Sequence, residues 1–327
     1  MRKRRFGRTG LQVSELVFGG GWVGGILIHH DEAVRLEALR RAMAAGIDWI
    51  DTAADYGKGV SEETIGRLLP SLEQRPQLST KVRLELADGQ DLTQQIERSL
   101  EASLERLRLP SVDLFILHNP IVPETSGGMI GATEVLRKGG IADTFDRLRA
   151  KGLFRYQGIT ALGDAPSCCQ VLESGRFDVA QTYYNLLNPT AAMDKAPKGW
   201  AAHDFSGLLR SCRAKDVGVM AIRILAAGVL ATKERHGREI PVYPSAEIGR
   251  EEARAEAALG ILGARYGTPA QTAIRFGLTH PDISCVVVGL AELAHLDEAL
   301  VAERAGPLPT EATAALDATW RGPYASL

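Results

Sequence analysis

The sequence predicts an α/β fold, a (β/α)₈ barrel that residues 1–327 build as a single domain. Eight short apolar segments alternate with segments of helical periodicity, which is typical of parallel strands joined by crossover helices. No linker-like stretch divides the chain, and barrels of this length are common as one domain. An open doubly wound sheet is the alternative.

The first half of the chain predicts a hairpin and then strand–helix units. The turn signal around Gly7–Gly10 predicts a hairpin over residues 4–13. Barrel strands are expected at 15–18, 47–51, 77–81 and 113–118. Helices are expected from Asp31 to Gly46, over 61–69 before Pro70, and over 91–107, where Asp31 and Asp91 are suitable N-caps.

The second half predicts four more strands and two long connections. Strands are expected at 155–160, 178–184, 217–222 and 284–288, and helices at 144–151, 166–174, 205–215, 251–266, 269–278 and 292–302. Connections in α/β units usually have about 2–6 residues. We therefore expect the connection 119–140 to be a loop that acts as a lid on the substrate side. The loop 226–249 is expected to fold over a dinucleotide, and a tail should end the chain.

Composition excludes several classes of partner. The 38 Lys and Arg residues balance 40 Asp and Glu, so no general electrostatic attraction to nucleic acid or an anionic membrane is expected. No apolar run approaches the roughly 20 residues that span a bilayer, and none follows the basic start as in a signal peptide. The four cysteines lack metal-ligand spacing, which predicts reduced thiols, no metal site and a cytoplasmic location. A small molecule is the expected partner, and no pattern indicates an oligomeric state.

Four polar residues follow the ends of three successive predicted strands: Asp51, Tyr56, Lys81 and His118. In a barrel these ends meet on the face where the chemistry takes place. A free phenol has a pKa near ~10, and a neighbouring cation such as Lys81 favours its phenolate form. Each residue also has a structural interpretation, since Asp51 could cap a turn and the Lys and His could be solvated or structural. Together they suggest acid–base chemistry.

These four residues, in their order and spacing, resemble the catalytic tetrad of the aldo-keto reductase superfamily. Similar motifs occur, in chain order, at Phe6–Ser14, Phe18–Gly20, Gly158–Thr160, Gln181 with Tyr184–Asn185, Ala221–Ala226 and Val288–Gly289. The resemblance implies that the hairpin closes the bottom of the barrel. Segments 158–160 and 287–290 look more like the sugar dehydrogenase branch, which oxidises aldoses such as galactose or fucose, than like the aldehyde-reductase branch.

The resemblance also implies the reaction. It predicts an NAD(P)(H)-dependent oxidoreductase that interconverts an aldehyde, ketone or aldose and the corresponding alcohol or lactone. Tyr56 would be the general acid and base, Lys81 and Asp51 would support it, and His118 would orient the substrate oxygen. The alternative is a regulatory subunit with little turnover, because some relatives bind the cofactor and act mainly as partners of membrane proteins.

The expected cofactor contacts come from several loops and strand ends. The resemblance places Thr160 and Gln181 at the nicotinamide carboxamide and Arg223 with Leu225 along the cofactor. The expected set is Gly20, Gly21, Thr160, Gln181, Arg223, Leu225, Gly228, Gly289 and His295. Glycines let a ligand approach the backbone, although the loop with Gly20 and Gly21 could also simply be flexible.

Cofactor preference is where this chain departs from the common pattern of the family. Thr160-Ala161 replaces a frequent Ser-Asn pair, and Ile222 stands where many members have a stacking aromatic residue. Gly289, Leu290, His295 and Ala299 replace the polar and cationic groups near the adenosine phosphate. NAD is therefore expected to serve at least as well as NADP, unless Lys233, Arg235 or Arg238 substitutes. His29 and His30 could touch substrate, and no carboxylate or cysteine cluster supports metal binding by them.

Overall fold

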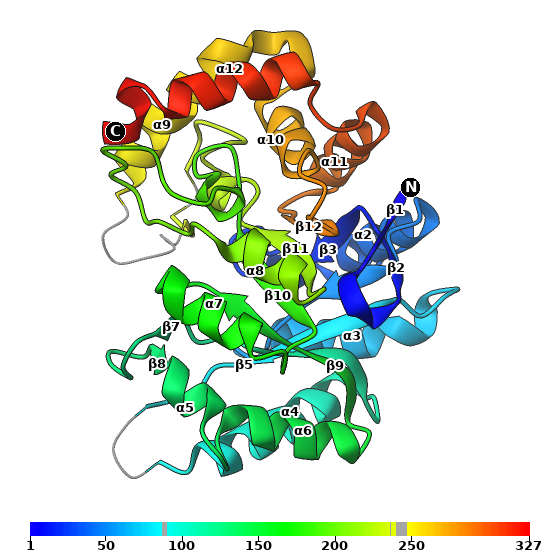
Figure 1. Ribbon diagram of the computed structural model, residues 1–327. Helices are drawn as coiled ribbons and strands as arrows, with labels where there is room; N and C mark the ends of the chain where they lie inside the picture. Colours follow the sequence, from blue (N-terminus) through cyan, green and yellow to red (C-terminus); the bar gives the residue numbers. More distant parts are fainter. Residues whose placement is uncertain (87–89, 236, 240–246) are drawn as a thin grey trace.

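The computed structural model, which describes residues 1–86, 90–235, 237–239 and 247–327, contains a closed barrel of parallel strands inside a ring of helices (Figure 1). Around the barrel the strands run in the order β10-β11-β12-β3-β4-β5-β6-β9. Their bounds are Leu16–Gly19 for β3, Trp49–Asp51 for β4, Gln77–Val82 for β5, Val112–Leu117 for β6, Phe154–Ala161 for β9, Val179–Tyr183 for β10, Gly218–Ile222 for β11 and Cys285–Gly289 for β12. Closure confirms the predicted barrel and excludes the open sheet.

Helices follow the strands where the periodicity predicts them, with small shifts at the ends. They are α2 (Glu32–Ala44), α3 (Val60–Leu68), α4 (Leu92–Leu107), α6 (Ile141–Ala150), α7 (Ala165–Glu173), α8 (Leu208–Ala214), α9 (Ile248–Leu262), α10 (Pro269–Gly277) and α11 (Leu293–Ala305). The side chains of Asp31 and Asp91 accept hydrogen bonds from the first turns of α2 and α4, as expected for N-caps. Helix α8 begins later than predicted, because Gly207 has a left-handed φ of 86° and is its N-cap, so the helix cannot extend back to residue 205.

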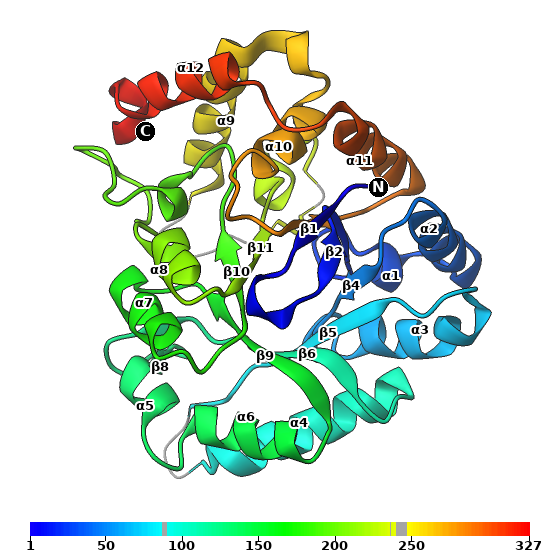
Figure 2. The same ribbon diagram turned by 45° about the vertical axis from the view of Figure 1, so that its right-hand side comes forward.

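The N-terminal hairpin closes one end of the barrel. Strands β1 (Lys3–Arg5) and β2 (Gln12–Ser14) pair antiparallel, and Figure 2 shows them in front of the barrel strands. Between them Phe6 is fully buried, with its ring centroid 5.4 Å from that of Trp49. Gly218 at the start of β11 has no side chain because a Cβ there would lie 2.5 Å from the Phe6 ring. Phe6 is thus the plug that the predicted hairpin supplies.

The connection 119–140 is not the loop that its glycines and prolines predict. It contains β7 (Ile121–Val122), β8 (Ile130–Gly131) and α5 (Ala132–Leu136). The Ile121 N–H donates to the Leu162 carbonyl at 2.8 Å, and Ile130 is fully buried. The apolar residues at these positions therefore dock the segment beside the end of β9. The expectation of a loop throughout 119–140 is wrong, since β7, β8 and α5 lie there, while its role as a lid stays a prediction.

Two further expectations need correction. The last helix is not α11, because α12 (Thr310–Trp320) follows it in place of the expected tail and packs along α9 (Figure 1). The short helix α1 (Ile26–His29) lies where a loop was expected. Of the predicted dinucleotide loop 226–249, residues 236 and 240–246 lie outside the described residues. Within the described ranges, no helix has the length and apolar character needed to cross a bilayer.

Candidate active site

Strand alternation brings the predicted acid and amine to one place inside the barrel. Strands β4 and β5 are neighbours, with Asp51 opposite Ser79 in the register. Residues two apart in a strand face the same side. Asp51 therefore shares the interior face with Trp49, and Lys81 shares it with Ser79. Both charged side chains are buried at the carboxyl ends of their strands.

Lys81 joins the acid to the phenol. Its Nζ donates to Asp51 Oδ2 at 2.8 Å, to the Thr52 carbonyl at 2.8 Å and to the Tyr56 hydroxyl oxygen at 3.1 Å. An ammonium group has three hydrogens, so these contacts use all of its donors. The Lys81 cation is fixed in direction, and the Tyr56 oxygen is one of its acceptors.

The remaining oxygen of Asp51 is also occupied. Asp51 Oδ1 accepts from Ser79 Oγ at 2.6 Å and from Gln181 Nε2 at 2.7 Å. Ser79 Oγ accepts in turn from Trp49 Nε1 at 3.1 Å. A buried carboxylate costs free energy unless it is paired and hydrogen-bonded, and Asp51 is both.

Burial and charge act in opposite directions on these groups. Burial alone would lower the pKa of Lys81, but Asp51 and the Tyr56 oxygen outweigh it, so the pKa is raised and the amine stays charged. Burial raises the pKa of Tyr56, and the nearby Lys81 lowers it by less. Lys81 therefore lowers the pKa of Tyr56, as expected, but burial raises it by more, so the net shift of this pKa is upward. Tyr56 is a neutral phenol that can donate a proton.

His118 completes the group directly after β6. Its backbone N–H donates to the Val82 carbonyl at 2.8 Å, and its ring centroid lies 5.8 Å from that of Tyr56, edge to face. Its Nδ1 lies 3.3 Å from Asp55 Oδ1, and Arg83 Nε donates to Asp55 Oδ2 at 3.0 Å. Burial lowers the pKa of His118. The structure thus brings all four predicted polar residues together.

The expected carboxamide contacts stand at the same end of the barrel. Thr160 lies near the end of β9, four residues after Tyr156, and therefore on its inward face. Thr160 Oγ1 is buried and has no hydrogen-bond partner among the described residues. Gln181 uses its amide nitrogen on Asp51, which leaves its carbonyl oxygen for another donor. A buried hydroxyl without a partner and an amide with a free oxygen suit a polar ligand group.

The segment after β11 has an unusual backbone. Arg223, Ala226 and Ala227 all have positive φ although none is glycine, and Gly228 has a φ of 99°. Such conformations cost on the order of 1–3 kcal/mol each and cluster at ligand sites. Successive backbone N–H groups in such turns can form a concave anion site. The predicted residues Arg223, Leu225 and Gly228 all lie in this strained turn.

The other expected cofactor contacts, Gly20, Gly21, Gly289 and His295, lie in different surroundings. A Cβ on Gly20 would lie 2.7 Å from Ser61 Oγ, so packing within the protein already requires glycine there. A Cβ on Gly21 would lie 3.7 Å from the Tyr56 ring. Gly289 ends β12 and is exposed, and a Cβ there would lie 4.0 Å from the Gly24 backbone nitrogen. His295 is exposed, with Nδ1 accepting from the Ala291 N–H at 3.3 Å. Of these four residues, Gly21 lies beside the Tyr56 ring, and Gly20 donates its backbone N–H to the Asp51 carbonyl at 2.8 Å.

Sequence reasoning missed three residues of this site. Ser79 holds Asp51, and the period of two that points Lys81 inward also points Ser79 inward, so this signal was present. Asp55, in the loop after β4, contacts both His118 and Arg83. Arg83 itself lies in the loop after β5. Neither has a periodic signal, because their meeting depends on how the loops after β4 and β5 fold.

The two histidines of the first loop are held locally. The ring of His29 packs edge to face on Trp22 with centroids 4.6 Å apart, and His30 Nε2 lies 2.7 Å from the Ala291 carbonyl oxygen. A search of the described residues finds no group of three or more metal-ligating side chains. The arrangement does not bring His29 or His30 into contact with the four central residues.

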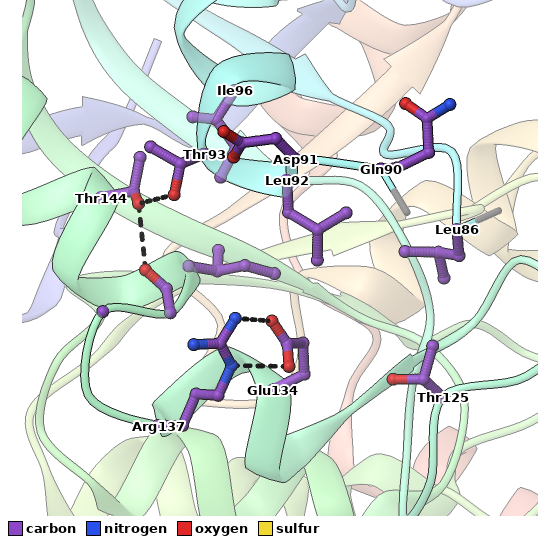
Figure 3. A pocket seen from close by; sticks show the side chains of 13 residues that line it. Leu86, Gln90, Asp91, Leu92, Thr93, Ile96, Thr125, Glu134, Arg137 and Thr144 are labelled. Atoms are coloured by element: carbon purple, nitrogen blue, oxygen red, sulfur yellow. Dashed lines mark hydrogen bonds and ion pairs between the residues drawn. The ribbon is translucent and has the colours of Figure 1, made fainter. Parts of the chain in front are cut away.

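A cavity of about 530 Å³ lies away from this site (Figure 3). It opens between the start of α4 and the segment that includes α5 and the start of α6. Arg137 and Glu134 form a bidentate pair there, with both distances 2.7 Å, and Thr93 contacts Thr144 at 3.2 Å. The lining residues are Leu86, Gln90, Asp91, Leu92, Thr93, Ile96, Thr125, Glu134, Arg137, Gly139, Gly140, Ile141 and Thr144. None of the four central residues lines this cavity. Of its charged groups, Glu134 and Arg137 pair with each other and Asp91 caps α4.

Known proteins resemble this chain over almost its whole length. The sequence model of the aldo/keto reductase family matches residues 15–321. The chain is 27% identical over 316 residues to L-galactose dehydrogenase of Arabidopsis thaliana, covering 91% of this chain and 87% of that protein. It is 26% identical over 322 residues to D-threo-aldose 1-dehydrogenase of Pseudomonas sp, covering 89% of each.

A solved structure has the same fold. An aldo-keto reductase from Bacillus halodurans, in its holo form, superposes with a TM-score of 0.72 over 97% of this chain and 96% of that chain, at 21% sequence identity. At that identity the likeness concerns the barrel architecture.

Proposed function

The chain belongs to the aldo/keto reductase family, and on that premise we propose that it interconverts an aldose or another small carbonyl compound with its alcohol or lactone, using Tyr56 to move the proton. It is an NAD(P)-dependent oxidoreductase, as its family and its aldose dehydrogenase relatives show. The substrate class follows from those relatives, which are named for L-galactose and D-threo-aldoses.

The observation that carries the proposal is the contact between Lys81 and Tyr56. Because Lys81 Nζ donates to the Tyr56 oxygen at 3.1 Å, the phenol's own hydrogen must point elsewhere. A substrate oxygen beside Tyr56 would receive that hydrogen. As the substrate oxygen gains charge during reduction, the phenol passes its proton on, and the fixed ammonium of Lys81 stabilises the phenolate that forms. In oxidation the same groups act in reverse.

The residues present fit a nicotinamide cofactor. When bound, it supplies or accepts the hydride. Thr160 Oγ1 and the free carbonyl oxygen of Gln181 would hold the carboxamide, since both lack another use in the described chain. The strained turn with Arg223, Leu225 and Gly228 would hold the phosphates. We assign the outer end of the cofactor to Gly289 and His295, and its inner edge to Gly20 and Gly21.

We further propose that NAD serves at least as well as NADP. Selecting a 2′-phosphate takes cationic donors, for which Arg is best suited. Among the residues expected near the adenosine phosphate, His295 has an exposed side chain, whereas Leu290 and Ala299 are buried. Arg235 is already paired with Glu252 at 2.9 Å. We also propose that residues 1–327 form one domain and that the protein acts in the cytoplasm, where its four free cysteines would stay reduced.

The experiment is an absorbance assay of nicotinamide turnover with sugars plus oxidised cofactor and aldehydes plus reduced cofactor. Tyr56→Phe should lower kcat by about 10²-fold or more while cofactor binding survives. Tyr156→Phe is the matched control, because that hydroxyl donates to the Thr9 carbonyl at the hairpin end of the barrel. Near-full activity of Tyr56→Phe would eliminate Tyr56 as the proton donor. Cofactor binding without turnover on any substrate would favour a regulatory subunit instead.

A further inference from the structure

The start of helix α9 carries a buried acid that the candidate site does not use. Glu251 lies in the first turn of α9, and only 9% of its surface is exposed. Its carboxylate forms no hydrogen bond or ion pair with any residue that the structure describes. We propose that Glu251 is a cofactor-specificity residue, whose carboxylate accepts hydrogen bonds from the adenosine ribose hydroxyls of NAD and repels the 2′-phosphate of NADP. This inference rests on the proposed function, which supplies the dinucleotide.

Arg254 shares the buried face of α9 with Glu251, one turn along the helix, but it binds other groups. Residues three apart on a helix are neighbours, and an acid and a base at this spacing can pair. The guanidinium carbon of Arg254 instead lies 5.5 Å from the Trp200 ring centroid and 5.9 Å from that of Tyr324. Its Nη2 donates to the Leu327 carbonyl oxygen at 2.9 Å. Glu251 is therefore left for a donor from outside the described chain.

A buried carboxylate without a partner costs free energy. Burial raises the pKa of Glu251, and Arg223 and Arg254 lower it by less. Buried polar groups in native proteins nearly always have a hydrogen-bond partner, so an exception calls for a reason such as a missing ligand. The carboxylate oxygens of Glu251 are not among the fully enclosed atoms that lack a partner. A bound molecule with O–H groups can therefore reach them.

The position of Glu251 suits the adenosine half of the dinucleotide. The proposed contacts place the nicotinamide at Thr160 and Gln181 in the barrel mouth, and the phosphates at the turn that begins with Arg223. Arg223 is one of the two positive charges that act on Glu251. Helix α9 lies outside the strand barrel, beside α12 (Figure 1). Outward from the phosphates the cofactor continues as the adenosine ribose, so Glu251 would meet that sugar.

A carboxylate can distinguish the two cofactors at this ribose. NAD presents free 2′- and 3′-hydroxyls, which are donors, and an ionised carboxylate offers two acceptor oxygens. In another dinucleotide-binding fold an acid holds the 2′-hydroxyl in this way. NADP has a phosphate in place of that hydroxyl, which removes the donor and sets negative charge against Glu251. Specificity is strongest when a site combines attraction for one ligand with repulsion of its competitor, and Glu251 supplies both.

The test measures dinucleotide binding to the full chain without substrate, by titration calorimetry at pH 8 (a chosen condition), where the carboxylate form is favoured. Glu251→Gln should weaken NAD⁺ binding by about 10-fold or more and strengthen NADP⁺ binding, because a charge-assisted hydrogen bond and a repulsion are both lost. NAD⁺ without the adenosine 2′-hydroxyl should bind the unmodified protein more weakly than NAD⁺ does, and the two should bind Glu251→Ala equally. Glu256→Gln, which removes an exposed acid of the same helix, should leave every affinity unchanged.

The outcomes separate this inference from the proposed function. An NAD⁺ to NADP⁺ affinity ratio that is the same in Glu251→Gln and the unmodified protein overturns the role of Glu251, even if sugars or aldehydes are turned over. Binding of NAD⁺ that depends on Glu251, without turnover of any carbonyl or sugar, keeps this inference and refutes the proposed reaction. If circular dichroism shows that Glu251→Gln does not fold, Glu251→Asp replaces it. That shorter acid should weaken NAD⁺ binding and still exclude NADP⁺, and a gain in NADP⁺ binding there overturns the proposal.

Discussion

Lys81→Met removes the group on which the proposed acid–base chemistry depends. Methionine has a similar length but no charge, so the variant loses the three donated hydrogen bonds to Asp51, Thr52 and Tyr56. Asp51 is left as a buried carboxylate with two donors, Ser79 and Gln181. One substitution thus tests both the stability of the ion pair and the activation of the phenol.

The expected magnitudes follow from those contacts. Removing one partner of a buried ion pair costs about 3–5 kcal/mol in the free energy of unfolding. Because two hydrogen bonds to Asp51 survive, we expect the lower end, about 3 kcal/mol. Tyr56 loses the cation that opposes its burial, so its pKa rises further. The alkaline rise of alcohol oxidation should move to higher pH, and kcat at neutral pH should fall by about 10²-fold or more.

The assay pairs urea unfolding with the pH profile of kcat/KM for sugar oxidation. Adding Asp51→Asn to Lys81→Met removes the unpaired charge, so it should recover part of the stability and none of the activity. Lys151→Met, an exposed residue after α6, controls for the loss of a positive charge. An unchanged pH profile, or a stability loss under about 1 kcal/mol, would refute the coupling of Lys81 to Tyr56 and Asp51.

Three further predictions follow from the fold and the site. The ratio of kcat/KM for the two cofactors should not favour NADP, and a preference for it of about 100-fold, near 2.7 kcal/mol, would reveal a phosphate clamp that the described residues do not show. Burial lowers the pKa of both His118 and His280, so the unfolded chain takes up protons first, and stability should fall as pH drops through about 6.5. Urea midpoints that are equal at pH 8 and pH 5.5 (chosen conditions) would contradict this. Gly218→Ala should cost about 1–3 kcal/mol in thermal or urea unfolding, because its Cβ would enter the Phe6 ring, and a neutral effect would mean that the plug can move.

Local sequence pattern determined most of the fold. The eight apolar segments, the capping residues Asp31 and Asp91, and the turn around Gly7 act over a few residues, so their consequences can be deduced without knowing distant contacts. The same holds for Asp51 and Lys81, whose positions at strand ends followed from the alternation of strands and helices. A parallel barrel places such ends on one face, which is why their meeting was predictable.

Only the tertiary structure decided what depends on contacts between distant segments. Residues 121–136 and 310–320 form helices and strands because they dock on the rest of the barrel. The composition of these segments alone does not predict that stabilisation. The net rise in the pKa of Tyr56 depends on how deeply the phenol is buried, and burial is a property of the whole fold. The contact of Asp55 with His118 has the same origin, since the loops after β4 and β6 had to meet before the carboxylate could come within 3.3 Å of the imidazole.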